Sequence, residues 1–240
     1  MAGPLVTPPV RPLVGVIPCA DRSGAIGGAP PPLLQTGEGS FLERAIALLR
    51  VAGVDQVLVG VRDRRDPVAA EALRAGASVV EVAEGDRDPA ASLRAAGAAV
   101  RGGGPGVQGE SGSPPGPGPA VDPAPVSTYL CLPPTFPLIR KDTMEELARA
   151  WREAASPARI LAPVLPADSP RAGIPWWELA PLFLRGPDPA ARLPQDPGHP
   201  PDALPVRVEV VDPGVAERID TLPLYRRHFP QAFRKRFQKW

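Results

Sequence analysis

Short apolar runs alternate with amphipathic stretches over about the first hundred residues, and this alternation is the feature that most constrains the fold. Strand patterns are expected at residues 13–17, 55–61 and 78–82, and helical patterns at 41–51, 67–75 and 89–100. Connections that pass through a helix join parallel strands with a right-handed crossover. The order therefore predicts an α/β fold with a doubly wound, mostly parallel sheet and helices on both faces.

The second half of the chain continues this pattern after an interruption. Residues 101–126 are almost entirely Gly, Pro, Ser and Ala, so we expect a disordered insertion there. Further elements are expected as strands at 128–132, 159–164 and 206–211, a helix at 142–155, a helical or extended segment at 176–184, and a basic helical tail at 222–240. We expect all 240 residues to form one domain.

Composition excludes several classes of function. A formal net charge of +1 argues against a nucleic-acid binder that neutralises many phosphates. The two cysteines, outside any metal-ligand spacing, favour a reducing compartment. No stretch approaches the roughly 18 to 20 apolar residues that span a bilayer, and the first residues do not read as a signal peptide. We therefore expect a cytoplasmic protein.

The loop at residues 21–32, which we call the cradle loop, joins the first strand to the first helix. Ser40 and Glu43 form a capping box ahead of that helix. A Gly-rich and Ser-rich loop in this place is how α/β folds cradle phosphate. Candidate anion-binding residues here are Ser23, Gly24, Gly27 and Gly28; alternatively, the glycines serve only the turn.

The order of several motifs resembles the MobA-like nucleotidyltransferases, especially the molybdenum-cofactor cytidylyltransferase branch. Residues 18–27, 33–34 and 42–44 are similar to that family's L-A-A-G-x-S-x-R-M-G-x-x-K-x-L-L and L-E-R. Further similar segments lie, in the family's order, at 92–96, 132–138, 173–175, 188–192, 212–215 and 219–221. The resemblance implies a nucleotide-diphospho-sugar transferase-like fold and, for an active member, Mg²⁺ and a nucleoside triphosphate.

The departures from the family pattern fall where its chemistry would be. In the cradle loop, Asp21 replaces the family's glycine, Ala25 its arginine, and Pro31 or Pro32 its lysine. Thr135 stands at the position of the family's metal-binding aspartate. Ile174 replaces the histidine of G-H-P, Ala190 the glycine of D-x-G-A-R, and Arg218 the acidic residue before I-D-T. Losing one electrostatic element of a transition-state site typically costs about 3 to 4 kcal/mol. The resemblance therefore implies a binding or regulatory module that lacks catalytic activity and needs no cofactor.

The alternative is an active Mg²⁺-dependent cytidylyl- or guanylyltransferase. Its substrate would be a phosphorylated small molecule such as a molybdenum-cofactor precursor. Arg22 and Asp220 would then be the catalytic candidates, with Asp220 also a metal ligand; otherwise Asp220 only orders the turn into the last helix. Ser92 lies near the nucleotide base in the family, or is a plain residue of a helix N-terminus.

The C-terminal tail interleaves cations with aromatic residues at near-helical spacing. Such a pattern fits an acidic protein partner, an anionic membrane surface or RNA. The partner would contact the basic residues between Arg226 and Lys239. The alternative is a solvated helix whose phenylalanines pack back on the domain. A further hypothesis makes the tail the functional part and the domain its carrier.

Two residue pairs complete the sequence-level candidates. Cys19 and Cys131 follow or end neighbouring strands, so their side chains are expected to approach one another, or simply to be two small buried residues. Trp176 and Trp177 lie where the family lines its acceptor pocket, as a plug or as a recognition platform. Neither histidine has a spacing that indicates catalysis or metal binding.

Overall fold

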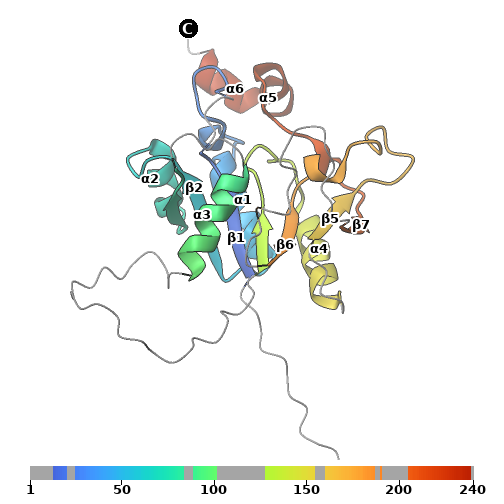
Figure 1. The fold of residues 1–240 in the computed structure, drawn as a ribbon. Helices are drawn as coiled ribbons and strands as arrows, with labels where there is room; N and C mark the ends of the chain where they lie inside the picture. Colours follow the sequence, from blue (N-terminus) through green and yellow to red (C-terminus); the bar gives the residue numbers. More distant parts are fainter. Residues whose placement is uncertain are drawn as a thin grey trace, which may run out of the picture.

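The computed structural model describes residues 13–20, 25–83, 89–101, 128–154, 160–186, 190 and 205–238 (Figure 1). The described strands form one sheet of seven strands in the order β3-β2-β1-β4-β6-β5-β7. Their bounds are β1 Leu13–Pro18, β2 Gln56–Val61, β3 Ser78–Glu81, β4 Thr128–Cys131, β5 Ile160–Val164, β6 Leu182–Arg185 and β7 Val206–Glu209.

Most pairings in this sheet are parallel. Strands β3, β2, β1 and β4 run parallel to one another, and β7 runs parallel to β5. The exception is β6, which pairs antiparallel with both β4 and β5. The predicted mostly parallel, doubly wound sheet is confirmed. The segment expected to be helical or extended at 176–184 contains both, since the 3₁₀ helix η2, Trp176–Glu178, precedes β6.

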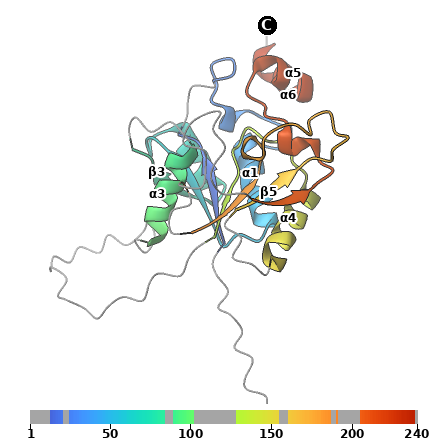
Figure 2. The same cartoon turned by 45° about the vertical axis from the view of Figure 1, so that its right-hand side comes forward.

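Helices cover both faces of the sheet (Figures 1 and 2). On one face, α1 (Phe41–Val51), α2 (Pro67–Arg74) and α4 (Lys141–Glu153) share a core with the sheet. On the other face, α3 (Pro89–Arg101) and η2 contribute to a second core. Alternate residues of β1 supply the two cores, Ile17 to the first and Val16 to the second, as the period of a strand requires.

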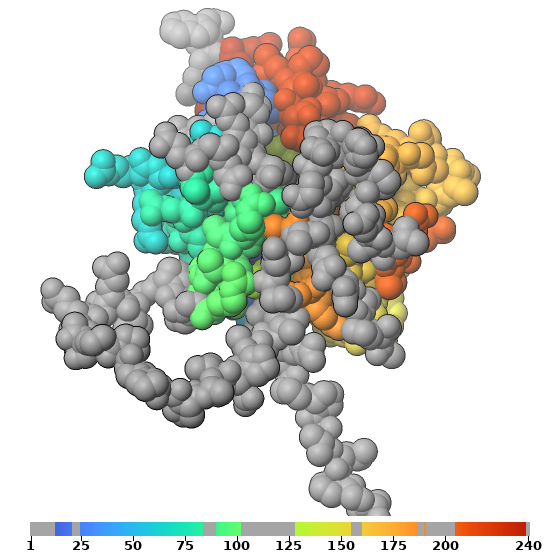
Figure 3. Space-filling view, viewed as in Figure 1, coloured from blue at the N-terminus to red at the C-terminus, as the bar shows by residue number. Residues whose placement is uncertain are grey.

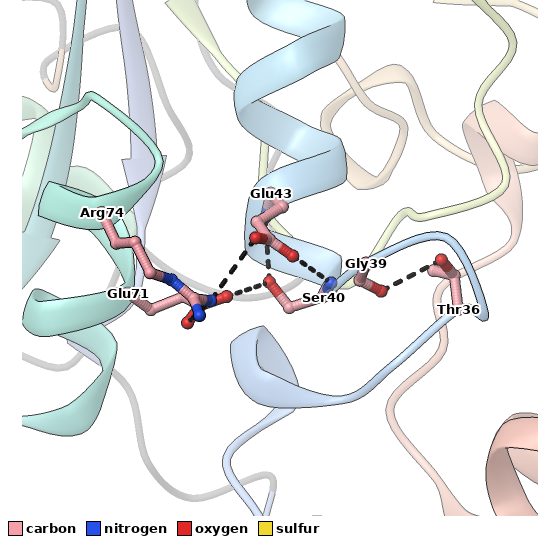
Figure 4. A network of polar contacts seen from close by, with 6 residues as sticks. All are labelled: Thr36, Gly39, Ser40, Glu43, Glu71 and Arg74. Atoms are coloured by element: carbon pink, nitrogen blue, oxygen red, sulfur yellow. Dashed lines mark hydrogen bonds and ion pairs between the residues drawn. The ribbon is translucent and has the colours of Figure 1, made fainter.

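Helix α1 begins at the predicted capping box, which is confirmed. Ser40 Oγ accepts a hydrogen bond from Glu43 N at 3.1 Å, and Glu43 Oε2 accepts one from Ser40 N at 2.7 Å. Ser40 Oγ also donates to Glu71 Oε1 of α2 at 2.8 Å, and Arg74 bridges Glu43 and Glu71 (Figure 4). The cap therefore ties the first two helices together as well as starting one of them.

The C-terminal tail forms two helices, α5 (Leu222–His228) and α6 (Pro230–Phe237). Pro230 is the first residue of α6, where its missing N–H costs nothing, and it cannot continue α5. In both views of the ribbon the two helices lie beside the loop that follows β1. The shorter 3₁₀ helices η1, Pro31–Leu33, and η4, Pro213–Ala216, belong to the loops at this end of the sheet.

Some predicted features lie outside the described residues. Of the insertion expected at 101–126, only Arg101 is described, and it ends α3 rather than beginning a loop. The rest of the insertion, residues 1–12 and the last two residues of the tail are not described. Among the helices that are described, none combines the length and apolar character needed to cross a membrane.

Candidate functional site

The candidate site lies where the carboxyl ends of β1, β2 and β4 meet. Cys19 N donates to Gly60 O of β2 at 2.9 Å, and Leu132 N donates to Val16 O of β1 at 2.9 Å. The connections run outward in opposite directions from β1 and β4, which makes this pair a topological switch point. Ligands of open α/β sheets bind in the crevice at such a point.

The described part of the cradle loop is a tight turn at Ile26–Ala29. Ile26 and Ala29 exchange both backbone hydrogen bonds, at 2.8 and 3.1 Å. Gly27 and Gly28 between them have φ of 57° and 80°, as a type I′ turn requires of its two central residues. This backbone conformation favours glycine at both positions. The other candidates of this loop, Arg22, Ser23 and Gly24, lie outside the described residues.

The C-terminal helices cover this turn. A Cβ on Gly27 would lie 2.6 Å from Phe237 Cε1 of α6. Ile26, Leu34 and Phe41 form a buried cluster with aromatic residues of α5 and α6. Tyr225 OH donates to Gln35 O at 2.9 Å, and burial raises the pKa of Tyr225. In Figure 3 the red atoms of α5 and α6 lie against the blue atoms of this loop.

The loop after β4 meets the segment that carries Asp220. Ile219 N donates to Thr135 O at 2.7 Å, so Asp220 follows directly on the residue bonded to Thr135. The Asp220 side chain is 39 % exposed, and its Oδ2 lies 3.4 Å from Arg218 Nε. The structure therefore brings the two sequence-predicted metal positions together, but only one of them carries a carboxylate.

These residues do not fit a divalent cation. Mg²⁺ takes hard oxygen ligands and is usually held through one or two carboxylates together with substrate phosphates. Here the segment after β4 carries a threonine, Thr135, in place of a carboxylate, and the Asp220 carboxylate has Arg218 as its neighbour. Among the described residues, no group of three or more His, Cys, Asp or Glu side chains gathers closely enough to hold a metal ion.

Buried contacts hold the loop after β4 in place. Arg44 of α1 donates through Nε to Pro137 O and through Nη2 to Ile139 O, the latter at 3.1 Å. Asp212 accepts from Arg140 N, Thr143 Oγ1 and Gly214 N at 2.8 to 2.9 Å. Sequence analysis placed Asp212 in a motif but did not find this role. An aspartate two residues before a glycine is a turn signal, but its distant partners have no local signal.

Ser92 and Arg62 lie on the β2 side of the site. Ser92, in the first turns of α3, is 1 % exposed, and its Oγ has no hydrogen-bond partner among the described residues. A Cβ on Gly60 of β2 would lie 2.4 Å from that Oγ, so the helix approaches the strand closely here. Arg62, the first residue after β2, donates through Nε to Ala20 O at 2.8 Å.

Arg62 is a site residue that the sequence analysis missed. Its signal was its position directly after a predicted strand, at the carboxyl edge of the sheet. It places a guanidinium group beside the end of β1, next to the cradle loop. Among the described residues, Arg62 therefore places a cation at this edge of the sheet.

The cysteines and tryptophans singled out from the sequence have packing roles in the structure. Cys19 belongs to one core cluster and Cys131 to the other, on opposite faces of the sheet. The expectation that their side chains approach one another was wrong, while both thiols are buried. Trp176 is 5 % exposed and lies edge-on to Trp177 at 5.7 Å between ring centroids, so it packs in the core rather than forming an open platform.

One histidine has a partner that sequence analysis did not find. His228 Nε2 of α5 lies 3.3 Å from Glu217 Oε1, and Arg171 forms an ion pair with the same carboxylate. Arg171 Nη1 also donates to Ala216 O at 2.7 Å. The network ties α5 and the segment before it to the turn around Arg171, and we assign it a structural role.

Comparison with models of known protein families gives a match over most of the chain. The sequence model of the MobA-like NTP transferase domain matches residues 15–206. A search of curated proteins found none that matches.

Three solved structures are similar to this chain. Rv0371c of Mycobacterium tuberculosis H37Rv is 22 % identical with a TM-score of 0.58, and the match covers 92 % of this chain and 99 % of that one. A nucleotidyl transferase of Methanothermobacter is 19 % identical with a TM-score of 0.60, covering 93 % and 98 %. CMP:2-keto-3-deoxy-manno-octonic acid synthetase, solved with CTP, is 15 % identical with a TM-score of 0.56, covering 93 % and 99 %. Rv0371c has also been solved with manganese.

Proposed function

This chain belongs to the MobA-like NTP transferase domain family, and we propose that it is a binding or regulatory module that does not catalyse nucleotidyl transfer. One observation carries the proposal. Thr135 lies where the family pattern has its metal-binding aspartate, and its backbone bonds Ile219, next to Asp220; the Asp220 carboxylate has Arg218 as its neighbour among the described residues. The fold and its ligand-binding edge are retained, while the charges that the reaction needs are not.

The physical argument concerns the charge that develops during transfer. The leaving pyrophosphate needs a metal ion and fixed cations to neutralise it as the bond to the α-phosphate breaks. A site with one carboxylate and no lysine in its cradle loop supplies little of this stabilisation. Each missing element typically costs about 3 to 4 kcal/mol in the barrier, and the losses combine in a non-additive way.

Binding of a nucleotide or small phosphorylated molecule without metal is part of the proposal. Arg62 at the end of β2 offers positive charge, and the buried Ser92 Oγ offers a hydrogen-bonding group on the side where the family holds its base. Ser23, Gly24, Gly27 and Gly28 stay in the proposal as donors of the cradle loop. The proposal places the protein in the cytoplasm, consistent with two unpaired cysteines.

The second candidate function is an active Mg²⁺-dependent cytidylyl- or guanylyltransferase. Arg62 favours it, because this cation at the carboxyl edge supplements Arg22. Asp220 would be the metal ligand in that case, and the acceptor would be a phosphorylated small molecule such as a molybdenum-cofactor precursor. Nothing else among the described contacts adds a second carboxylate beside Asp220.

Thermal unfolding with CTP, GTP and ATP, each with and without Mg²⁺ or Mn²⁺, separates the two candidates. A ligand that binds only the folded state raises its stability by about 2.7 kcal/mol at a hundredfold excess over Kd. We expect any nucleotide stabilisation to be independent of metal and to be lost in Arg62→Ala but not in Arg65→Ala, a nearby exposed control. Metal-dependent stabilisation together with pyrophosphate release would overturn the proposal.

A further inference from the structure

The C-terminal helices concentrate positive charge that has no carboxylate partner. Helices α5 and α6 carry Arg226, Arg227, Arg234, Lys235 and Arg236, all exposed, and residues 222–240 contain no Asp or Glu. None of these five cations forms an ion pair with a carboxylate of the described residues, whereas arginines elsewhere, such as Arg74, Arg171 and Arg218, do. Because the whole chain has a net charge of only +1, the rest of it carries an excess of negative charge.

The same two helices form a hollow. It has a volume of about 500 Å³ and is lined by Arg226, Pro230, Phe233, Arg234 and Gln238. The Arg226 Cζ lies 5.7 Å from the centroid of the Phe233 ring. Two guanidinium groups from different helices therefore border the hollow, with the amide of Gln238 as a third polar group.

The described aromatic residues of the tail pack against the fold. Tyr225 is fully buried and Phe233 is 9 % exposed, and both pack with Phe41 and the loop after β1. Single-stranded nucleic acid binds to such tails by stacking bases on exposed rings, and interfacial helices insert a free apolar face into lipid. The rings of the described tail residues lie in this cluster, so the chemistry that these residues leave to a partner is that of the cations and the hollow.

From these observations we propose that the hollow of α5 and α6 binds an acidic segment of a partner protein. A guanidinium group binds a carboxylate through two parallel, charge-assisted hydrogen bonds, and Arg226 and Arg234 offer one such group each. This inference does not depend on the loss of nucleotidyl transfer, since the hollow lies on helices outside the sheet.

Fluorescence anisotropy with a labelled decapeptide of alternating Asp and Glu tests the inference on the full chain. Binding is expected at about 50 mM salt and to weaken as salt screens the charges. The double variant Arg226→Ala/Arg234→Ala should weaken binding about tenfold or more. Arg149→Ala, which removes an exposed arginine of α4, should leave the affinity unchanged. Unfolding temperatures equal to that of the wild type will show that the variants fold.

Several results would overturn the inference. These are absence of peptide binding at low salt, equal affinity in the double variant, and equal affinity for a peptide with Asn and Gln in place of the acids. Tighter binding of a single-stranded RNA or of phosphatidylserine vesicles would assign the surface to another partner. A dimer of the wild-type protein that dissociates in the double variant would assign the hollow to a second copy of the chain.

Discussion

The ring of Phe237 occupies the space into which a side chain on Gly27 would project, with Cε1 only 2.6 Å from the position of that missing Cβ. The last turn of α6 thus rests on the turn of the cradle loop, and sequence neighbours play no part in the contact. Glycine at this position serves two purposes, since it adopts a φ of 57° and also leaves room for the ring.

Gly27→Ala should therefore destabilise the protein by about 1 to 2 kcal/mol, through a left-handed backbone conformation and a displaced Phe237. Gly28→Ala is the matched control, because its φ is 80° but nothing lies within 4 Å of its Cβ position. Urea unfolding of both variants should show the larger loss for Gly27→Ala. Phe237→Ala should remove the difference between them; equal losses in the two glycine variants would contradict the role of the ring.

Ser40 joins α1 to α2, and its removal should cost more than the loss of an ordinary cap. Ser40→Ala deletes the cap to Glu43 N and leaves Glu71 Oε1 without its donor, at a site that is fully buried. We expect a loss of about 2 kcal/mol in the free energy of unfolding. Thr36→Ala, which removes one partly buried and one exposed hydrogen bond within the same loop, should cost well under half of that.

A double-mutant cycle separates the two parts of this loss. If Ser40 acts only as a cap, Ser40→Ala and Glu71→Ala will be additive in urea unfolding. We expect a coupling of about 0.5 to 1 kcal/mol because the two side chains share a hydrogen bond.

Elements with strong local signals were predicted closely. The expected helix at 41–51 is the observed α1, because Ser40 and Glu43 mark its start and Gly53 marks its end. The tail was predicted as helical, with its aromatic residues at near-helical spacing; Tyr225 and Phe233 are buried in one cluster, and Phe229 and Phe237 pack against it partly buried. The break at Pro230 was missed, although proline at an interior helix position indicates a new start.

Features that depend on contacts between distant segments were not predictable. Strand β6 is antiparallel and lies between β4 and β5, yet its residues 182–185 form a short apolar run that fits either a helix or a strand. The error on Cys19 and Cys131 has a simple cause. Val16 lies opposite Cys131, and Cys19 comes three residues later, an odd number that places it on the other face.

The candidate site was predicted in part. The sequence placed Thr135 and Asp220 at the carboxyl edge, and the bond from Ile219 N to Thr135 O brings these segments together. Arg62 belonged to no motif, and Arg44 belonged to one that did not indicate its contacts, because an arginine's role depends on which carbonyl or ligand its long side chain reaches. Their contacts, to Ala20 O and to the loop after β4, appear only in the folded chain.

The buried thiols predict a loss of stability at alkaline pH. Burial raises the pKa of Cys131 from 9.0 to about 12. The pKa of Cys19 is also raised, by burial first and by the Asp66 carboxylate second. Below about pH 9 both thiols keep their protons in the folded and unfolded states, so the stability that they contribute is fully present. As pH rises above that value, the unfolded chain ionises first, and stability falls by about 1.4 kcal/mol per pH unit for each thiol.

Urea unfolding at about pH 8 and about pH 10 measures this loss, with the variant Cys19→Ala/Cys131→Ala as control. The variant should be less stable at the lower pH but should show a smaller decline between the two. A thiol reagent at the lower pH should label the native protein only as fast as it unfolds, because the thiolate is the reactive form. Rapid labelling of the folded protein, or an equal decline in the variant, would contradict the assignment.

The missing carboxylate at Thr135 leads to the last prediction. Thr135→Asp places a second acid beside Asp220, at the point where Ile219 N bonds the backbone of residue 135. Two carboxylates attract a divalent cation that one does not hold against Arg218. We expect Mn²⁺ to raise the thermal stability of Thr135→Asp but not of the wild type. By calorimetry, the affinity of Thr135→Asp for Mn²⁺ should be at least about tenfold higher than that of the wild type, or about 1.4 kcal/mol in binding free energy.

Two further variants serve as controls. Thr135→Asn should not gain this response to Mn²⁺, and adding Asp220→Asn to Thr135→Asp should remove it. If the wild type binds Mn²⁺ as tightly as Thr135→Asp does, the loss of the metal position is not what separates this chain from an active transferase, and the proposed function fails with it.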